Sequence, residues 1–125
     1  MDKVVDIAGS APQTAPLSHA RCFGDLVFTS GQVSKDLMTG TAMPGTIEEE
    51  TEQVLKNVKT VLEAAGSSLE CVLKTTVFMV DKGDFQQMNK VYEKFFPGAK
   101  PGRSTVVVGL AGNFKIEIEA VAHKK

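Results

Sequence analysis

The sequence predicts an α+β fold in which two helices pack on one face of a mixed β-sheet. Two observations carry this prediction. Apolar residues recur at helical spacing in two segments, and the segments around them are rich in β-branched and aromatic residues. Their order is strands, helix, strand, helix, strands. A chain of 125 residues that is 42% hydrophobic and 23% charged can bury one core, so residues 1–125 are expected to form a single domain.

The N-terminal part of the chain is expected to be extended. A short strand is predicted at about Val4–Ile7, and Pro12 and Pro16 keep the following segment extended. Leu26–Thr29 is the next apolar run, and it ends at Ser30-Gly31. This pattern predicts a strand followed by a turn.

The first helix has clear signals at both ends. Thr46 is a suitable N-cap, and Glu49, three residues later, completes a capping box. Gly66 is a natural stop. Between these residues one apolar stripe recurs at three- and four-residue spacing, which predicts an amphipathic helix: Ile47, Thr51, Val54, Leu55, Val58, Val61, Leu62 and Ala65.

A second helix is expected to start at Asp84, with Gln87 at the matching capping-box position, and to end before Pro97. Asn89 is expected to be a local tether and Tyr92 a core residue. The residues predicted to point inward are Phe85, Met88, Val91, Tyr92 and Phe95.

Three further strands are predicted at Val72–Val80, Ser104–Val108 and Phe114–Ala122. The first is apolar on both faces, with Val72, Phe78 and Val80 on one and Leu73, Val77 and Met79 on the other. Such strands are expected to be buried on both faces, but two helices cover only one. An exposed apolar face of this size indicates a protein partner, so we expect a homo-oligomer with sites in the clefts between subunits.

Composition narrows the class of protein. The formal net charge of −1 predicts no broad attraction to nucleic acid or to an anionic membrane. Early acidic residues argue against a signal peptide, and no apolar segment reaches the roughly 20 residues that span a bilayer. Cys22 and Cys71 have no C-x-x-C spacing, which predicts reduced thiols in a cytoplasmic protein.

The sequence lacks the motifs that several kinds of catalytic and binding chemistry require. His19 and His123 are not at metal-ligand spacing, so no metal site is expected. The sequence has no glycine-rich phosphate motif, no G-x-S-x-G elbow and no convincing Cys–His nucleophile pair. We therefore expect a reaction that uses neither a cofactor nor a covalent nucleophile.

Arg103 is one of only two arginines, with Arg21, among fourteen basic residues. It lies between Pro101-Gly102 and an apolar strand, a position from which a side chain can be aimed. A guanidinium binds a carboxylate through two parallel hydrogen bonds, and bonds to charged groups are worth about 1.5–3 kcal/mol each. The alternative is an ordinary surface arginine after a turn.

Glu117 and Glu119 alternate with Ile116 and Ile118, so the two acids share one strand face. That face is usually solvated. If a partner covers it, one acid becomes partly buried and its pKa rises toward the range of a general base. Near the start of the chain, Ser30-Gly31 permits close backbone approach to a ligand, with a simple turn as the alternative.

Six motifs occur in order between about Pro16 and Ala122: Thr29-Ser30-Gly31-Gln32, Asn57-Val58-Lys59 with Glu63-Ala64-Ala65-Gly66, Lys74-Thr75-Thr76-Val77-Phe78, Asn89 with Tyr92-Glu93-Lys94-Phe95-Phe96, Arg103-Ser104, and Ile116-Glu117-Ile118-Glu119-Ala120. In identity and spacing they resemble the RidA/YjgF family of small imine deaminases. The resemblance implies a chorismate-mutase-like α+β fold and a homotrimer with three clefts between subunits.

The resemblance also implies an activity and roles for residues. The expected reaction is the cofactor-free hydrolysis of 2-imino and enamine acids, such as 2-iminopropanoate and 2-iminobutanoate, to 2-oxo acids and ammonia. In this picture Arg103 binds the substrate carboxylate and Glu117 positions or activates water. Ser30 and Gly31 belong to the loop that closes the pocket, and Asn89 lies near it.

Two substrate-binding positions depart from the family pattern. Leu17 follows Pro16 where the active deaminases carry a tyrosine, and Thr105 stands where many members have a cysteine. The change at Thr105 is expected to be mild. The missing tyrosine hydroxyl predicts an altered substrate preference, a slower reaction or a different ligand.

Two other functions stay open. Leu17 keeps open a carboxylate-binding or chaperone-like trimer without catalysis. A ribonuclease or translation inhibitor is disfavoured by the near-neutral charge and by the lack of a basic stripe interleaved with aromatic residues.

Overall fold

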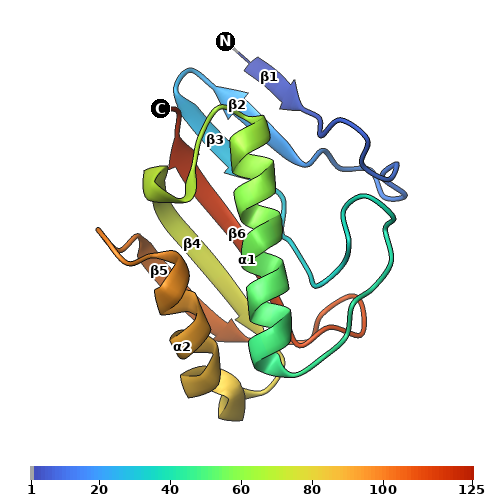
Figure 1. Cartoon of the computed structure of the whole chain (residues 1–125), viewed down its shortest axis with the longest axis vertical. Helices are drawn as coiled ribbons and strands as arrows, with labels where there is room; N and C mark the ends of the chain where they lie inside the picture. The colour runs from blue at the N-terminus through green and yellow to red at the C-terminus, as the bar shows by residue number, and fades with distance from the viewer. Residues whose placement is uncertain (1) are drawn as a thin grey trace.

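A computed structural model of the chain describes residues 2–125. In this part of the chain two α-helices lie on one face of a six-stranded sheet (Figure 1). The strand order is β1-β2-β3-β6-β4-β5, with β4 and β5 parallel and the other pairs antiparallel. The predicted α+β class and mixed sheet are confirmed. The elements are β1 Asp2–Val5, β2 Ala20–Phe23, β3 Leu26–Thr29, α1 Ile47–Ala64, β4 Val72–Met79, α2 Phe85–Phe95, β5 Gly102–Val107 and β6 Ile116–His123, with short 3₁₀ turns η1 Leu69–Cys71 and η2 Lys82–Asp84.

The signals predicted for α1 are confirmed. The Thr46 side chain accepts from the backbone N–H of Glu49, and the Glu49 carboxylate accepts from the backbone N–H of Thr46. At the other end Gly66 has a φ of +81°, which costs glycine little, and the Ser67 N–H bonds back to the Leu62 carbonyl. The apolar stripe of α1 is buried against the sheet.

The start of α2 differs from the prediction. Asp84 makes no side-chain cap, and the predicted capping box with Gln87 is absent. Instead, Asp81 accepts from the backbone N–H of Gly83 and starts η2, which leads directly into α2. Phe85, predicted to point inward, is 42% exposed because it lies at the first position of α2, beyond the core.

Two predictions for the N-terminal part were incomplete. The first strand lies at Asp2–Val5 rather than Val4–Ile7, and β2 at Ala20–Phe23 was not predicted. The segment of β2 alternates buried and exposed residues over four positions only, too few for a periodicity signal. It pairs on both sides, with β1 and with β3.

The prediction of which β4 side chains share a face was wrong at the start of the strand, for Val72 and Leu73. A register shift between Val72 and Lys74 interrupts the pairing of β4 with β6. As a result Val72 is buried on the same side as Val77, whereas Leu73 is 51% exposed. A bulge inserts one residue and reverses the alternation before it, which the sequence pattern does not reveal.

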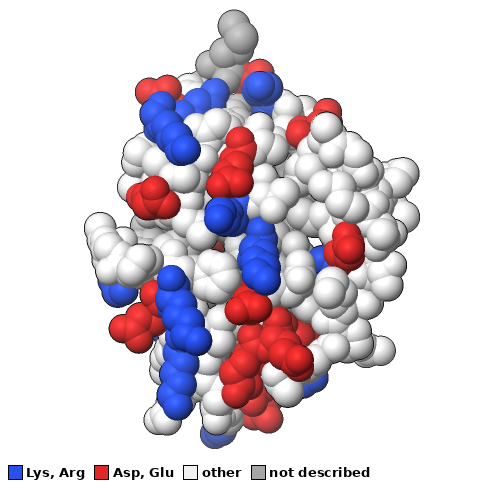
Figure 2. Space-filling model, in the orientation of Figure 1, with Lys and Arg blue, Asp and Glu red and all other residues white. Residues whose placement is uncertain are grey.

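The face of the sheet away from the helices carries apolar side chains open to solvent. Leu26 and Phe28 on β3 and Val106 on β5 are each more than a third exposed. The opposite, helical face is charged with both signs, and acidic side chains gather over the start of α1 (Figure 2). Among residues 2–125 no helix is long and apolar enough to cross a membrane.

A buried carboxylate joins α1 to the start of β6. Glu50 is 1% exposed, and its two oxygens accept from the backbone N–H groups of Lys115, at 2.9 Å, and Gly45, at 3.3 Å. The Lys115 ammonium lies 3.6 Å away as a counter-charge. These bonds fix the end of β6 that leads into Glu117.

Replacement of Glu50 by glutamine is expected to lower the free energy of unfolding by about 2 kcal/mol, because an amide N–H then faces a backbone N–H in a buried site. Urea denaturation measures this loss. Glu48→Gln, in the same helical turn but exposed, is the matched control and should change stability by less than about 0.5 kcal/mol. Equal effects of the two changes would contradict the structural role of Glu50.

Candidate functional site

Arg103 projects from β5 toward α2. In the sheet it is level with Thr75 on β4, which is level with Ala120 on β6, and both neighbours are buried on the helical side. One Arg103 nitrogen, Nη1, donates to Asn89 Oδ1 at 2.8 Å. The guanidinium carbon lies 4.8 Å from the centroid of the Tyr92 ring. The side chain is therefore held in one place by α2.

The contacts with Arg103 follow from the spacing of residues on α2. Phe85, Asn89 and Tyr92 are four and three residues apart, so they share one face of the helix. The Phe85 ring centroid lies 5.7 Å from the guanidinium carbon, which adds a second aromatic contact. Tyr92 is itself anchored, because its hydroxyl is 2.7 Å from Thr75 Oγ1 and the residue is 7% exposed.

A pocket of about 300 Å³ opens beside the guanidinium. Asn89 takes one of the five N–H donors of an arginine, and the planar fork suits a carboxylate. The lining contains two cations, one carboxylate and one aromatic ring: Asn89, Tyr92, Glu93, Lys100, Pro101 and Arg103. The site can thus orient a small anionic molecule.

Thr105 lies two residues beyond Arg103 on β5 and on the same side of the sheet. Its hydroxyl oxygen is buried and, within residues 2–125, has no hydrogen-bond partner. An unpaired buried hydroxyl costs about 1–3 kcal/mol. In a single chain this hydroxyl does not open into the pocket beside Arg103.

Glu117 lies on the other face of the sheet. It is level with Phe78 on β4, which is level with Val106 on β5, whereas its neighbours Ile116 and Ile118 face the core. Burial raises the pKa of the Glu117 carboxyl above its usual value of 4.5, and the nearby Glu119 charge raises it further. This carboxyl is suited to exchange protons at a less acidic pH than an ordinary glutamate.

Gly31 packs directly against the Glu117 side chain. A methyl group at Gly31 would overlap the present position of the carboxylate, so a larger residue there would displace the Glu117 side chain. The contact is fixed by backbone bonds on both sides of Gly31. Ser30 N–H donates to the His19 carbonyl at 2.9 Å, and Gln32 N–H donates to the Ile118 carbonyl at 2.8 Å.

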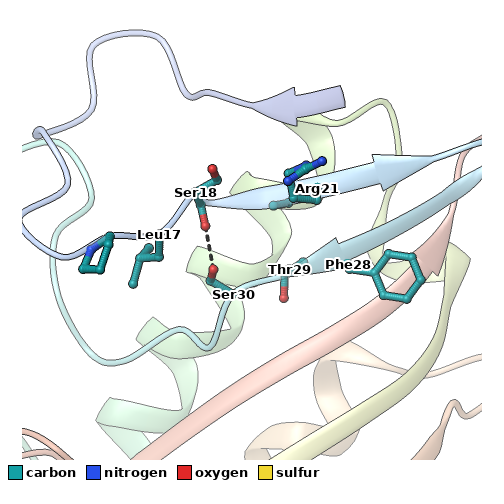
Figure 3. Close-up of a pocket in the computed structure, with 8 residues that line it drawn as sticks. Leu17, Ser18, Arg21, Phe28, Thr29 and Ser30 are labelled. Carbon is teal, nitrogen blue, oxygen red and sulfur yellow. Dashed lines mark hydrogen bonds between the residues drawn. The ribbon is translucent and has the colours of Figure 1, made fainter. Parts of the chain in front are cut away.

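Ser30 and Leu17 lie side by side along one hollow (Figure 3). The Ser30 hydroxyl donates to the Ser18 carbonyl at 2.5 Å, so its proton is engaged in a hydrogen bond within the loop. Leu17 is 48% exposed and borders two adjoining hollows. The larger, of about 460 Å³, is lined by Pro16, Leu17, Ser18, Ala20, Arg21, Phe28, Thr29 and Ser30.

The predicted site residues therefore form two groups. Arg103, Asn89 and Thr105 gather on the helical side of β5. Glu117, against which Gly31 packs, lies on the opposite side of the sheet, and Ser30 and Leu17 line hollows next to Gly31. One chain does not bring the two groups to a common small molecule.

Sequence reasoning missed the aromatic platform under Arg103. Tyr92 was predicted as core, which it is, but it also contacts the guanidinium. The sequence shows that Phe85, Asn89 and Tyr92 share one helix face, but it does not show that their common partner is Arg103. Within residues 2–125 no three His, Cys, Asp or Glu side chains are grouped to hold a metal ion.

Comparison with known proteins places this chain in one family. A family model described as Endoribonuclease L-PSP matches residues 8–124. The chain belongs to this family, the RidA/YjgF family predicted from the motifs.

Named relatives are similar along most of the chain. The chloroplastic Reactive Intermediate Deaminase A of Arabidopsis thaliana is 40% identical over 96% of this chain and 65% of its own length. The 2-iminobutanoate/2-iminopropanoate deaminase of Mus musculus is 36% identical over 96% and 90%. The crystal structure of E. coli TdcF with bound serine superposes with a TM-score of 0.90 at 35% identity, covering 98% of this chain and 99% of that one.

Proposed function

We propose that this protein hydrolyses reactive 2-imino and enamine acids to 2-oxo acids and ammonia without a cofactor. The observation that carries the proposal is Arg103, held toward a pocket by Asn89 and two aromatic rings. Two relatives named as deaminases of reactive intermediates or of 2-iminobutanoate and 2-iminopropanoate support this substrate class. The serine in the TdcF structure is also a small molecule with an α-carboxylate.

The chemistry needs few groups. Arg103 would bind the carboxylate of the imine through two parallel hydrogen bonds and fix the position of the C=N carbon. Glu117 would accept a proton from water as the water oxygen bonds to that carbon, and the proton would pass to the imine nitrogen. The resulting carbinolamine loses ammonia, and the carbon–oxygen double bond of the 2-oxo acid forms.

We propose further that Arg103 and Glu117 of different subunits face one another in a homotrimer. Their positions on opposite faces of one sheet support this arrangement, because a shared ligand then requires a second copy. The exposed apolar residues Leu26, Phe28 and Val106 support a covering subunit on the face that bears Glu117.

Cys22 and Cys71 are buried free thiols, which supports the cytoplasm as the compartment.

Replacement of Arg103 by alanine is expected to lower kcat/KM for imine hydrolysis by about 100-fold or more, because two charge-assisted hydrogen bonds are lost. An amino-acid oxidase generates the imine in the assay, and semicarbazide traps the imine that remains. Lys90→Ala, an exposed change on α2, is the matched control. Equal activity of the wild type and Arg103→Ala would exclude the proposed role. A wild type that binds 2-oxo acids without any turnover would favour a carboxylate-binding protein.

The pH profile of kcat/KM should report Glu117. A raised pKa means that the carboxyl takes up its proton at a higher pH than an ordinary glutamate, so the basic form is lost earlier on acidification. Activity is therefore expected to fall on the acid side with a midpoint above 4.5, the usual value. Glu117→Gln should be slow at every pH and lack this acid limb. An unchanged limb in Glu117→Gln would assign the titration to another group.

A further inference from the structure

The segment that leads from α2 into β5 carries two cations within four residues. Lys100 and Arg103 lie on either side of Pro101-Gly102. Both line the pocket of about 300 Å³ whose other wall is formed by α2. A second cation therefore stands beside the one that binds the substrate carboxylate in the proposed reaction.

The position of Lys100 is restricted both by its backbone and by its ammonium group. Pro101 follows it, and a residue before proline is largely confined to extended conformations. The Lys100 ammonium donates to the carbonyl of Phe96, the residue directly after α2. An ammonium has three N–H donors, so two remain for a ligand. Lys100 thus lines the pocket from a restricted position, with donors that the fold does not use.

Neither cation of the pocket has a carboxylate in direct contact. Arg103 donates to the uncharged Oδ1 of Asn89, and Lys100 to a backbone carbonyl. Glu93 supplies the one carboxylate of the lining, but within residues 2–125 it forms no ion pair with Lys100 or Arg103. A molecule with a single carboxylate, bound at Arg103, leaves the Lys100 ammonium without a counter-charge. A molecule with two carboxylates gives each cation an anionic acceptor.

From this arrangement we propose that Lys100 is a specificity-determining residue that favours imino acids with an acidic side chain, such as those formed by oxidation of glutamate or aspartate. The proposal rests on the proposed function and names its substrate class. Arg103 binds the α-carboxylate, and Lys100 binds the carboxylate of the side chain. A pocket of about 300 Å³ lies at the small end of the range of small-molecule sites, which suits a molecule of this size.

The kinetic test compares two imines of equal chain length that differ in one carboxylate. Oxidases generate 2-iminoglutarate from glutamate and 2-iminopentanoate from norvaline, and kcat/KM is measured for both. The wild type is expected to prefer 2-iminoglutarate. Lys100→Gln should lower the ratio of the two kcat/KM values about fivefold, because one charge-assisted contact near solvent is lost, whereas Lys100→Arg should retain the ratio.

The matched control is Lys90→Gln, which removes an exposed charge from α2 outside the pocket lining and should leave the ratio as in the wild type. The ratio separates recognition from a structural role of the bond between Lys100 and Phe96. A loss that is equal for the two imines in Lys100→Gln would mean that Lys100 only holds the segment before Arg103, and would overturn the proposal. A wild-type preference for 2-iminopentanoate would overturn it as well.

A binding measurement separates this proposal from the proposed function. The dissociation constants of 2-oxoglutarate and 2-oxopentanoate are determined by NMR titration for the same four proteins. Tighter binding of 2-oxoglutarate that is lost in Lys100→Gln and kept in Lys100→Arg supports the second carboxylate site, even if no imine is hydrolysed and the deaminase proposal fails. Equal effects of Lys100→Gln on the two acids, in a protein that does hydrolyse imines, overturn this site and leave the deaminase proposal standing.

Discussion

The alternation of side chains along β-strands is the constraint on which the site depends. Successive residues point to opposite faces, and the paired register of β4, β5 and β6 extends this rule across the sheet. Arg103 is level with Thr75 and Ala120 on the helical side, whereas Glu117 is level with Phe78 and Val106 on the other. No rotation of side chains brings two groups through a hydrogen-bonded sheet. A site that uses both must therefore be completed by another copy of the chain.

Each half of the proposed site rests on a segment that is held by hydrogen bonds. Arg103 rests on Tyr92, whose hydroxyl is bound to Thr75 in the core, and Asn89 fixes the direction of its guanidinium. Glu117 is backed by Gly31, and the turn at Gly31 is bound to β6 and to the segment before β2. Supports of this kind reduce the reorganisation needed when a ligand binds. Leu17 directly precedes Ser18, whose carbonyl accepts from Ser30, so the position of Leu17 depends on the same turn.

Much of the fold could be predicted from the sequence, because its signals are local. The capping box of Thr46 and Glu49, the stop at Gly66 and the stripe of α1 need only neighbouring residues, and all are present. The features that were missed depend on distant partners. The bulge after Val72 depends on pairing with β6, and β2 exists because β1 and β3 pair with it. For the candidate site, Arg103 and Glu117 were singled out from sequence, but their separation by the sheet follows only from the strand register.

The most direct test of this account mixes two defective chains. Arg103→Ala and Glu117→Gln are expected to be inactive alone, and differently tagged copies are co-expressed so that mixed oligomers can be purified through both tags. If each site takes its arginine from one subunit and its glutamate from another, a trimer that contains both chains keeps one of its three sites intact, and imine hydrolysis should recover to about a third of the wild-type rate. Mixed oligomers that stay as inactive as either parent would contradict a shared site and place both groups in the same chain.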